Sequence, residues 1–122
     1  MRANVILTGD VNLMGVEDPA VPFRRVADAL HAADAVFGNL ECCLYEPPVP
    51  RTMMPDELSG YEGFYAPPAS GKALVLGGFH CVGNANNQNY GPEQIMASNA
   101  VLDELGIAHV GTGANRAEAR KP

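Results

Sequence analysis

Side chains with oxygen atoms follow three short apolar runs of the chain, and their types suit the binding of cations. They are Asp10 and Asn12 near the end of the first run, Asn39 and Glu41 near the end of the second, and Asn86 and Asn87 after the third. Carboxylate and amide oxygens are ligands for hard or borderline divalent cations. A carboxylate can also bridge two metal ions about 3.5–4 Å apart, an arrangement that cleaves phosphate esters. We therefore expect a cation pocket if the three runs end at one place.

The elements that must position these residues alternate between strands and helices. Apolar runs predict strands at residues 4–10, 35–41, 80–84 and 107–111, and the apolar spacing predicts helices at residues 22–34 and 91–106. This order is typical of an α/β fold with a mainly parallel sheet and flanking helices. Because parallel strands deliver their carboxyl ends to one edge of such a sheet, Asp10, Glu41 and Asn87 are expected to converge there.

The two helices show different signals. The first carries one apolar stripe, made of Phe23, Val26, Ala27, Leu30 and Ala33. The second has Pro92 at its start and Gly106 just past its end, as helix termini often do. Its inward-facing residues are expected to be Ile95, Met96, Leu102 and Leu105.

Composition limits the function classes. The chain has 122 residues, enough for one ordinary domain, and a net charge of -6 from 8 basic and 14 acidic residues, which argues against nucleic-acid binding. Three cysteines, two of them adjacent, make a disulfide framework unexpected. No apolar run approaches the roughly 20 residues of a membrane span. A cytoplasmic location is expected for the chain as given, and an extracytoplasmic one if a leader has been removed.

Three segments resemble, in order and spacing, the bacterial capsule synthesis family. They are "TGDVNLMG", "VFGNLEC" and "VGNANNQNYGPEQIMASNAVLDELGIAHVGTGAN". The CapA-type proteins of this family act in poly-γ-glutamate synthesis and are related to the calcineurin-like metallophosphoesterases. The resemblance implies that residues 1–122 form a single partial domain, the N-terminal half of a metallophosphoesterase-like α/β sandwich, with a long proline-rich loop at 42–70. It also implies a helix within 70–79. A missing C-terminal half, or a second copy in a homo-oligomer, would complete the sheet, so one flank should expose apolar surface.

Carried over by position, the resemblance also implies a metal site. Its ligands would be Asp10, Asn12, Glu41 and Asn87, with Glu41 as the bridging carboxylate and with Asn39 and Asn86 as supporting residues behind them. Two divalent metal ions, of manganese, zinc or iron, would bind if the site is complete, and none if it is not. The partner would be a phosphoester substrate or an anionic polymer.

Two departures from the family pattern bear on activity. Gln88 occupies the catalytic position where the family has a His, and Gln can donate a hydrogen bond but cannot transfer a proton near neutral pH. Asn89 stands where the family has an Asp. The later His-bearing motifs of the family have no counterpart, and His31, His80 and His109 lack the spacing of metal ligands, so we expect them to be structural.

Alternatives to a metal-dependent hydrolase stay open. The chain could be a non-catalytic binding or assembly protein for polyglutamate capsule biosynthesis. A serine esterase with a Gly-Asp-Ser motif also places short motifs at α/β strand ends, but Val11 stands where its nucleophile would be. Finally, the polar residues could serve only as turn formers and caps at strand ends.

Overall fold

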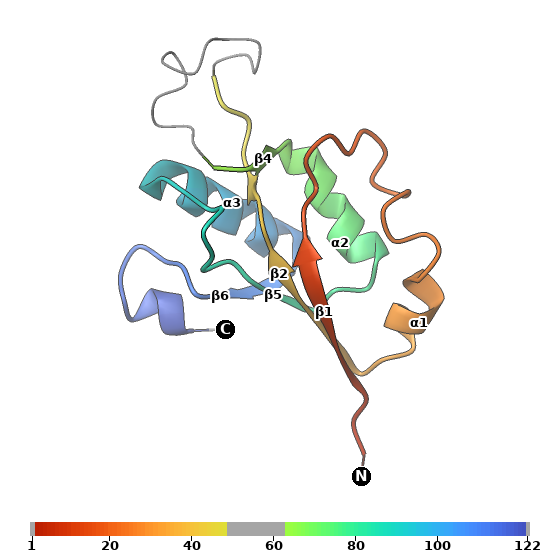
Figure 1. Ribbon diagram of the computed structural model, residues 1–122. Helices are drawn as coiled ribbons and strands as arrows, with labels where there is room; N and C mark the ends of the chain where they lie inside the picture. Colours follow the sequence, from red (N-terminus) through yellow and green to blue (C-terminus); the bar gives the residue numbers. More distant parts are fainter. Residues whose placement is uncertain (1, 49–62, 122) are drawn as a thin grey trace.

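The computed structural model describes residues 2–48 and 63–121 (Figure 1). The elements, in chain order, are strand β1 (Val5–Val11), helix α1 (Ala27–His31), strands β2 (Ala35–Leu40), β3 (Cys43–Leu44) and β4 (Tyr65–Ala66), the 3₁₀ helix η2 (Pro68–Gly71), helix α2 (Lys72–Leu76), strand β5 (Cys81–Gly83), helix α3 (Pro92–Leu105), strand β6 (Ala108–Val110) and the 3₁₀ helix η3 (Glu118–Arg120). The predicted α/β fold is confirmed, and so is the helix predicted within 70–79.

The main sheet has four strands in the order β1-β2-β5-β6, and all of its pairings are parallel. Each new strand is added on the same side of the previous one. Since crossover connections are almost always right-handed, α1, α2 and α3 are expected on one face of the sheet. The burial pattern agrees, because buried and half-buried residues alternate along β2.

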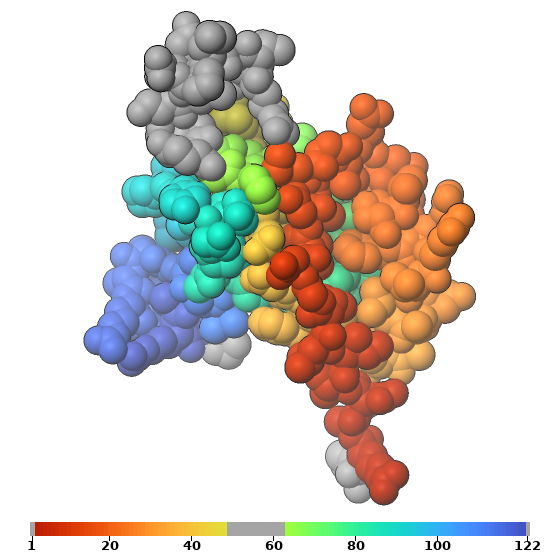
Figure 2. All heavy atoms as spheres, in the orientation of Figure 1, coloured from red at the N-terminus to blue at the C-terminus, as the bar shows by residue number. Residues whose placement is uncertain are grey.

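The other face of the sheet is partly open in the described part of the chain. Leu7 on β1 is 74% exposed, and its neighbours across the sheet, Phe37 and Cys81, are only half-buried. Figure 2 shows atoms of β1 and β2 open at the front of the molecule. A parallel sheet is normally covered on both faces. The exposed apolar side chain of Leu7 lies on this face, as does that of Val5 on the same strand.

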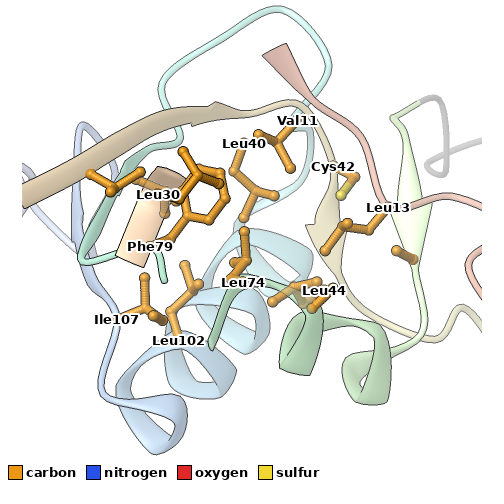
Figure 3. Close-up of a cluster of buried hydrophobic side chains, with 14 of the residues drawn as sticks. Val11, Leu13, Leu30, Leu40, Cys42, Leu44, Leu74, Phe79, Leu102 and Ile107 are labelled. Atoms are coloured by element: carbon orange, nitrogen blue, oxygen red, sulfur yellow. The ribbon is translucent and has the colours of Figure 1, made fainter. Parts of the chain in front are cut away.

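The core lies between the sheet and the helices. Figure 3 shows Leu40 of β2 and Phe79 meeting Leu74 of α2 and Leu102 of α3 in this layer. These four side chains are almost entirely buried. Burying a leucine stabilises a fold by about 1.5–3 kcal/mol, so this layer is what holds β2 and its end in place.

The first helix is shorter than predicted. The sequence indicated residues 22–34, but α1 covers only Ala27–His31, and turns precede it. Val26 was expected on the apolar stripe and is instead exposed, with a φ of -122° that lies outside the helical range. Leu30 and Ala33 are buried as expected.

The predicted long loop 42–70 contains regular structure at both ends. Cys43 and Leu44 of β3 pair in parallel with Tyr65 and Ala66 of β4 to form a separate two-stranded sheet. Pro68–Gly71 then forms η2 ahead of α2. The interpretation as one irregular excursion was wrong for these segments, and its centre, residues 49–62, lies outside the described residues.

Helix α3 begins and ends as predicted but buries different side chains. Gly106 ends it with a φ of 70°, a left-handed conformation that glycine adopts without strain. Met96 was expected to face inward and is 39% exposed. The buried residues of the helix are instead Gln94, Ser98, Asn99 and Leu102, three of which are polar.

Candidate metal site at the strand ends

Asp10 and Asn39 lie side by side at the carboxyl ends of β1 and β2. The Nδ2 of Asn39 donates a hydrogen bond of 2.8 Å to the Oδ1 of Asp10. A bulge makes this contact, because three steps along β1, from Leu7 to Asp10, match two steps along β2, from Phe37 to Asn39. Without the extra residue, Asp10 would point to the helix side of the sheet. Gly9 within the strand is the sequence signal that would have predicted the bulge.

Asn86 extends this contact to the third strand end. Its Nδ2 donates to the Oδ1 of Asn39 at 3.1 Å and to the carbonyl oxygen of Leu40 at 2.9 Å. Its Oδ1 accepts a hydrogen bond of 3.0 Å from the backbone N–H of Gln88. The side chains of Asp10, Asn39 and Asn86 therefore form one connected row across β1, β2 and the loop after β5.

The two other predicted ligands at these strand ends are held mainly through the backbone. The backbone N–H of Glu41 donates to the carbonyl of Val11 at 2.8 Å, which fixes Glu41 beside the end of β1. Asn87 is exposed, and it lies in the turn closed by Asn86. Neither the Glu41 carboxylate nor the Asn87 amide bonds to another described side chain, so both keep free ligand atoms. We call Asp10, Asn39, Glu41, Asn86 and Asn87 the strand-end cluster.

Asn12 and Gln88 have simpler local roles. The Oδ1 of Asn12 accepts a hydrogen bond of 2.9 Å from the backbone N–H of Met14, which is an Asx turn. The backbone carbonyl of Gln88 accepts from the N–H of Phe64 at 3.0 Å and so ties the turn to the residue before β4. The side chain of Gln88 makes no hydrogen bond with the described part of the chain.

Asn84 and Asn89 belong to the same stretch but were not singled out from the sequence as site residues. Asn89 donates through Nδ2 to the carbonyl of Leu40 at 3.0 Å and to the carbonyl of Asn84 at 2.8 Å. The side chain of Asn84 is buried and donates to the Oδ1 of Asn99 on α3 at 2.7 Å. The crowding of amides in "VGNANNQNYG" was the available signal, but it does not say which amide turns inward.

The three histidines lie away from the strand-end cluster. The Nε2 of His31 contacts the carbonyl oxygen of Leu76 at 2.9 Å, and the Nδ1 of His80 accepts a hydrogen bond of 3.1 Å from the N–H of Val36. The Nε2 of His109 lies 3.0 Å from the Oδ1 of Asp103. These contacts agree with the structural roles expected for these residues.

The cysteines offer no nucleophile at neutral pH. All three thiols are free. Burial raises the pKa of Cys42 to about 11 and that of Cys43 to about 11, and it also raises the pKa of Cys81. Because the thiolate is the reactive form, these residues are packing groups rather than catalytic ones.

The chemistry of the donors decides which metal ion fits. Within the described ranges 2–48 and 63–121, no three side chains of His, Cys, Asp or Glu lie together so that they could hold a metal ion. The strand-end cluster supplies two carboxylates, from Asp10 and Glu41, and an amide oxygen from Asn87. A set made only of oxygens suits a hard cation such as Mg²⁺ or Mn²⁺, whereas Zn²⁺ takes mainly nitrogen and sulfur ligands. With so few charged ligands, we expect weak binding.

A separate hollow of about 300 Å³ lies between α3, β6 and the C-terminal segment. Asn99, Asp103, His109, Glu118 and Lys121 are among the residues that line it. None of the predicted site residues is among them, so the hollow and the strand-end cluster are different places on the molecule.

No helix among the described residues is long and apolar enough to cross a membrane.

Two proteins of Sinorhizobium fredii (strain NBRC 101917 / NGR234), described as uncharacterized proteins y4sH and y4uA, are each 35% identical to the chain over 101 residues. The match covers 80% of this chain but 21% of each relative, so the chain spans about a fifth of their length. The family model described as bacterial capsule synthesis protein matches residues 4–122. The chain therefore belongs to the bacterial capsule synthesis protein family.

Proposed function

We propose that the strand-end cluster binds a divalent cation and that the chain is a metallophosphoesterase-like part of a protein of poly-γ-glutamate capsule synthesis. The observation that carries the proposal is the row formed by Asp10, Asn39 and Asn86. It joins three strand ends that are far apart in the sequence, and it leaves the second oxygen of Asp10 for a ligand. Glu41 follows β2 directly and Asn87 follows Asn86 in the chain, and their side-chain oxygens bond to no other described side chain, so we infer that they complete the ligand set.

Each residue of the cluster would have its own role in binding the cation. Asp10 and Glu41 would hold the cation, and Asn87 would add its amide oxygen. Asn39 would keep Asp10 oriented through the hydrogen bond of 2.8 Å. When bound, such a cation supplies the charge that polarises a phosphoryl oxygen and activates a water molecule. Gln88 would donate a hydrogen bond to a phosphoryl oxygen but would not protonate a leaving group.

Titration calorimetry with Mn²⁺ tests the cation claim. We expect weak binding to the wild-type chain and no measurable binding to Asp10→Ala. Asp28→Ala is the matched control, because Asp28 is an exposed carboxylate on α1 and lies outside the cluster. If Asp10→Ala binds Mn²⁺ as well as the wild type and the control do, the assignment of the site is wrong.

The second candidate is a non-catalytic binding or assembly protein, and the identity of residue 88 favours it. A general acid contributes about 10²–10⁴-fold to a reaction rate, and Gln88 cannot serve as one. A net charge of -6 also opposes direct contact with an anionic polymer, unless a cation bridges the two. Hydrolysis of a chromogenic phosphodiester by the Mn²⁺-loaded chain separates the candidates. Turnover that increases in Gln88→His supports the hydrolase, and no turnover in either form supports the binding protein.

A further inference from the structure

The carbonyl oxygen of Leu40, at the end of β2, accepts hydrogen bonds from two side chains of one loop. The Nδ2 of Asn86 lies 2.9 Å from it and the Nδ2 of Asn89 lies 3.0 Å from it. A carbonyl oxygen has two lone pairs, so both are used. We call this arrangement of the Leu40 carbonyl with the Asn86 and Asn89 amides the Leu40 clamp.

Both amides of the clamp also bind a second acceptor. The other hydrogen bond of Asn86 goes to the Oδ1 of Asn39 at 3.1 Å, and that of Asn89 goes to the carbonyl of Asn84 at 2.8 Å. Each NH₂ group has two hydrogens, so each donates twice and is fully used. Asn89 therefore connects the carbonyl end of β2 to the carbonyl end of β5, a link that the sheet itself does not make there.

The clamp acts on a single peptide unit, the one between Leu40 and Glu41. Its carbonyl accepts from the two amides, and its N–H, which belongs to Glu41, donates to the carbonyl of Val11 at 2.8 Å. A peptide unit is planar, so holding it at both ends fixes its orientation and with it the position of the Glu41 Cα, from which the side chain starts. Asn87 lies between the two clamping residues in the sequence, so the same bonds fix its turn.

We propose that Asn89 is a positioning residue, which locks the Leu40–Glu41 peptide to the turn that carries Asn87. Glu41 and Asn87 then approach a divalent cation from a fixed spacing, although neither side chain has a protein partner of its own among the described residues. The consequence for the cation depends on the function proposed above, whereas the clamp itself is a property of the backbone. Asn89 acts through Leu40 and is not itself a ligand.

The experiment compares Asn89→Ala with the wild-type chain in two measurements. The first is the ¹³C resonance of the Leu40 carbonyl, which responds to the hydrogen bonds that the carbonyl accepts. The second is the affinity for Mn²⁺ by calorimetry. We expect the resonance to move and the affinity to fall about 10-fold, the lower end of the usual effect of a residue that supports metal ligands. Asn86→Ala should move the same resonance, because it removes the other bond of the clamp.

A matched control separates positioning from general loss of stability. Ile107→Val removes one methylene from a buried residue just before β6, away from the clamp, and should lower thermal stability slightly. We expect it to leave the Leu40 resonance and the Mn²⁺ affinity unchanged. If it weakens Mn²⁺ binding as much as Asn89→Ala does, Asn89 has only a structural role and the proposal fails.

The remaining outcomes are decisive as well. An unmoved Leu40 resonance in Asn89→Ala overturns the clamp, and a moved resonance with wild-type Mn²⁺ affinity overturns the positioning role. If the wild-type chain binds no Mn²⁺, the proposed function fails, and the clamp is judged by amide hydrogen exchange at Asn87 and Gln88. Faster exchange in Asn89→Ala then supports the clamp, and unchanged exchange refutes it.

Discussion

Replacing Asn99 by alanine should destabilise the fold strongly, although Asn99 belongs to no predicted site. Asn99 is 4% exposed and its Oδ1 accepts a hydrogen bond of 2.7 Å from Asn84, which is 3% exposed. The hydroxyl of Thr112 donates to the Oδ1 of Asn84 at 2.8 Å and lies 3.2 Å from the Oδ1 of Asn99. These three side chains join α3, the end of β5 and the segment after β6.

The size of the loss in stability follows from the polar group that the substitution leaves without a partner. In Asn99→Ala, the Nδ2 of Asn84 stays buried and loses its acceptor, and an unsatisfied buried donor costs about 1–3 kcal/mol beyond the hydrogen bond itself. We expect a loss of about 2–3 kcal/mol. At roughly 4 °C per kcal/mol for a domain of this size, the melting temperature should fall by about 8–12 °C. Urea unfolding followed by circular dichroism measures the free energy directly.

A double-mutant cycle tests whether Asn84 and Asn99 are energetically coupled, which the total loss of stability in one variant does not show. Asn84→Ala combined with Asn99→Ala removes both partners, so the pair should cost less than the sum of the single variants, by about 1–2 kcal/mol. Asn4→Ala is the control, because the Asn4 side chain is exposed, and it should stay within about 0.5 kcal/mol of the wild type. Additive single costs, or a cost for Asn99→Ala no larger than that of the control, would refute the account of a coupled buried pair.

Three further predictions concern the core and the open face of the sheet. Burial raises the pKa of Cys42 and Cys43 from 9.0 to about 11, so the folded state holds these protons more tightly than the unfolded chain does. The stability that these thiols contribute should be complete below about pH 9 and should fall by up to about 3 kcal/mol per thiol as the pH rises through 11. Urea unfolding at several pH values measures this dependence on pH, and Cys42→Ser and Cys43→Ser should reduce it. Leu7→Thr should change the free energy of unfolding by less than about 0.5 kcal/mol, because Leu7 is 74% exposed, and a larger loss would mean that something covers this face in solution. Gly38→Ala should cost about 1–3 kcal/mol, because a Cβ there would lie 2.8 Å from a ring carbon of Phe79, and a wild-type melting curve would contradict this.

The order of strands and helices was predictable because it depends on patterns within short windows. Strands β1, β2 and β5 are apolar runs, and α3 has Pro92 at its first position and Gly106 at its end. Strands β3 and β4 were missed because each has only two residues, too few to show an alternation, and their pairing joins residues about 20 positions apart. Such a pairing is a property of the tertiary structure, so no local window contains it.

The inward face of α3 was predicted wrongly for a related reason. An apolar stripe assumes that buried residues are apolar, but Ser98 and Asn99 are buried because the fold gives them partners. The Oγ of Ser98 accepts a hydrogen bond of 2.9 Å from the N–H of Leu44, and Asn99 bonds to Asn84. A buried polar group is stable only when it is paired, and the pairing partners come from other elements.

The side-chain amides after β5 show what can be predicted from the fact that parallel strands end at one edge of a sheet. This fact led us to expect that Asp10, Glu41 and Asn87 converge. The side-chain contacts across the strand ends join Asp10 to the two residues expected to support the ligands, Asn39 and Asn86. The same fact could not distinguish the amides that hydrogen-bond within the protein from those that are free to bind a ligand, since all of them are the same residue types in one short stretch. The fold makes this distinction: Asn84, Asn86 and Asn89 each hydrogen-bond to the protein.

Asn87 is the asparagine of this stretch whose side chain has no hydrogen-bond partner among the described residues. A strand end leaves carbonyl groups that its sheet neighbours do not reach, and the carbonyl of Leu40 is one that side-chain amides satisfy instead. The crowding of asparagine is therefore mostly a requirement of the backbone. Because the same bonds that satisfy the Leu40 carbonyl also close the turn around Asn87, the structural amides and the candidate ligand are two parts of one arrangement, and changing the first should disturb the second.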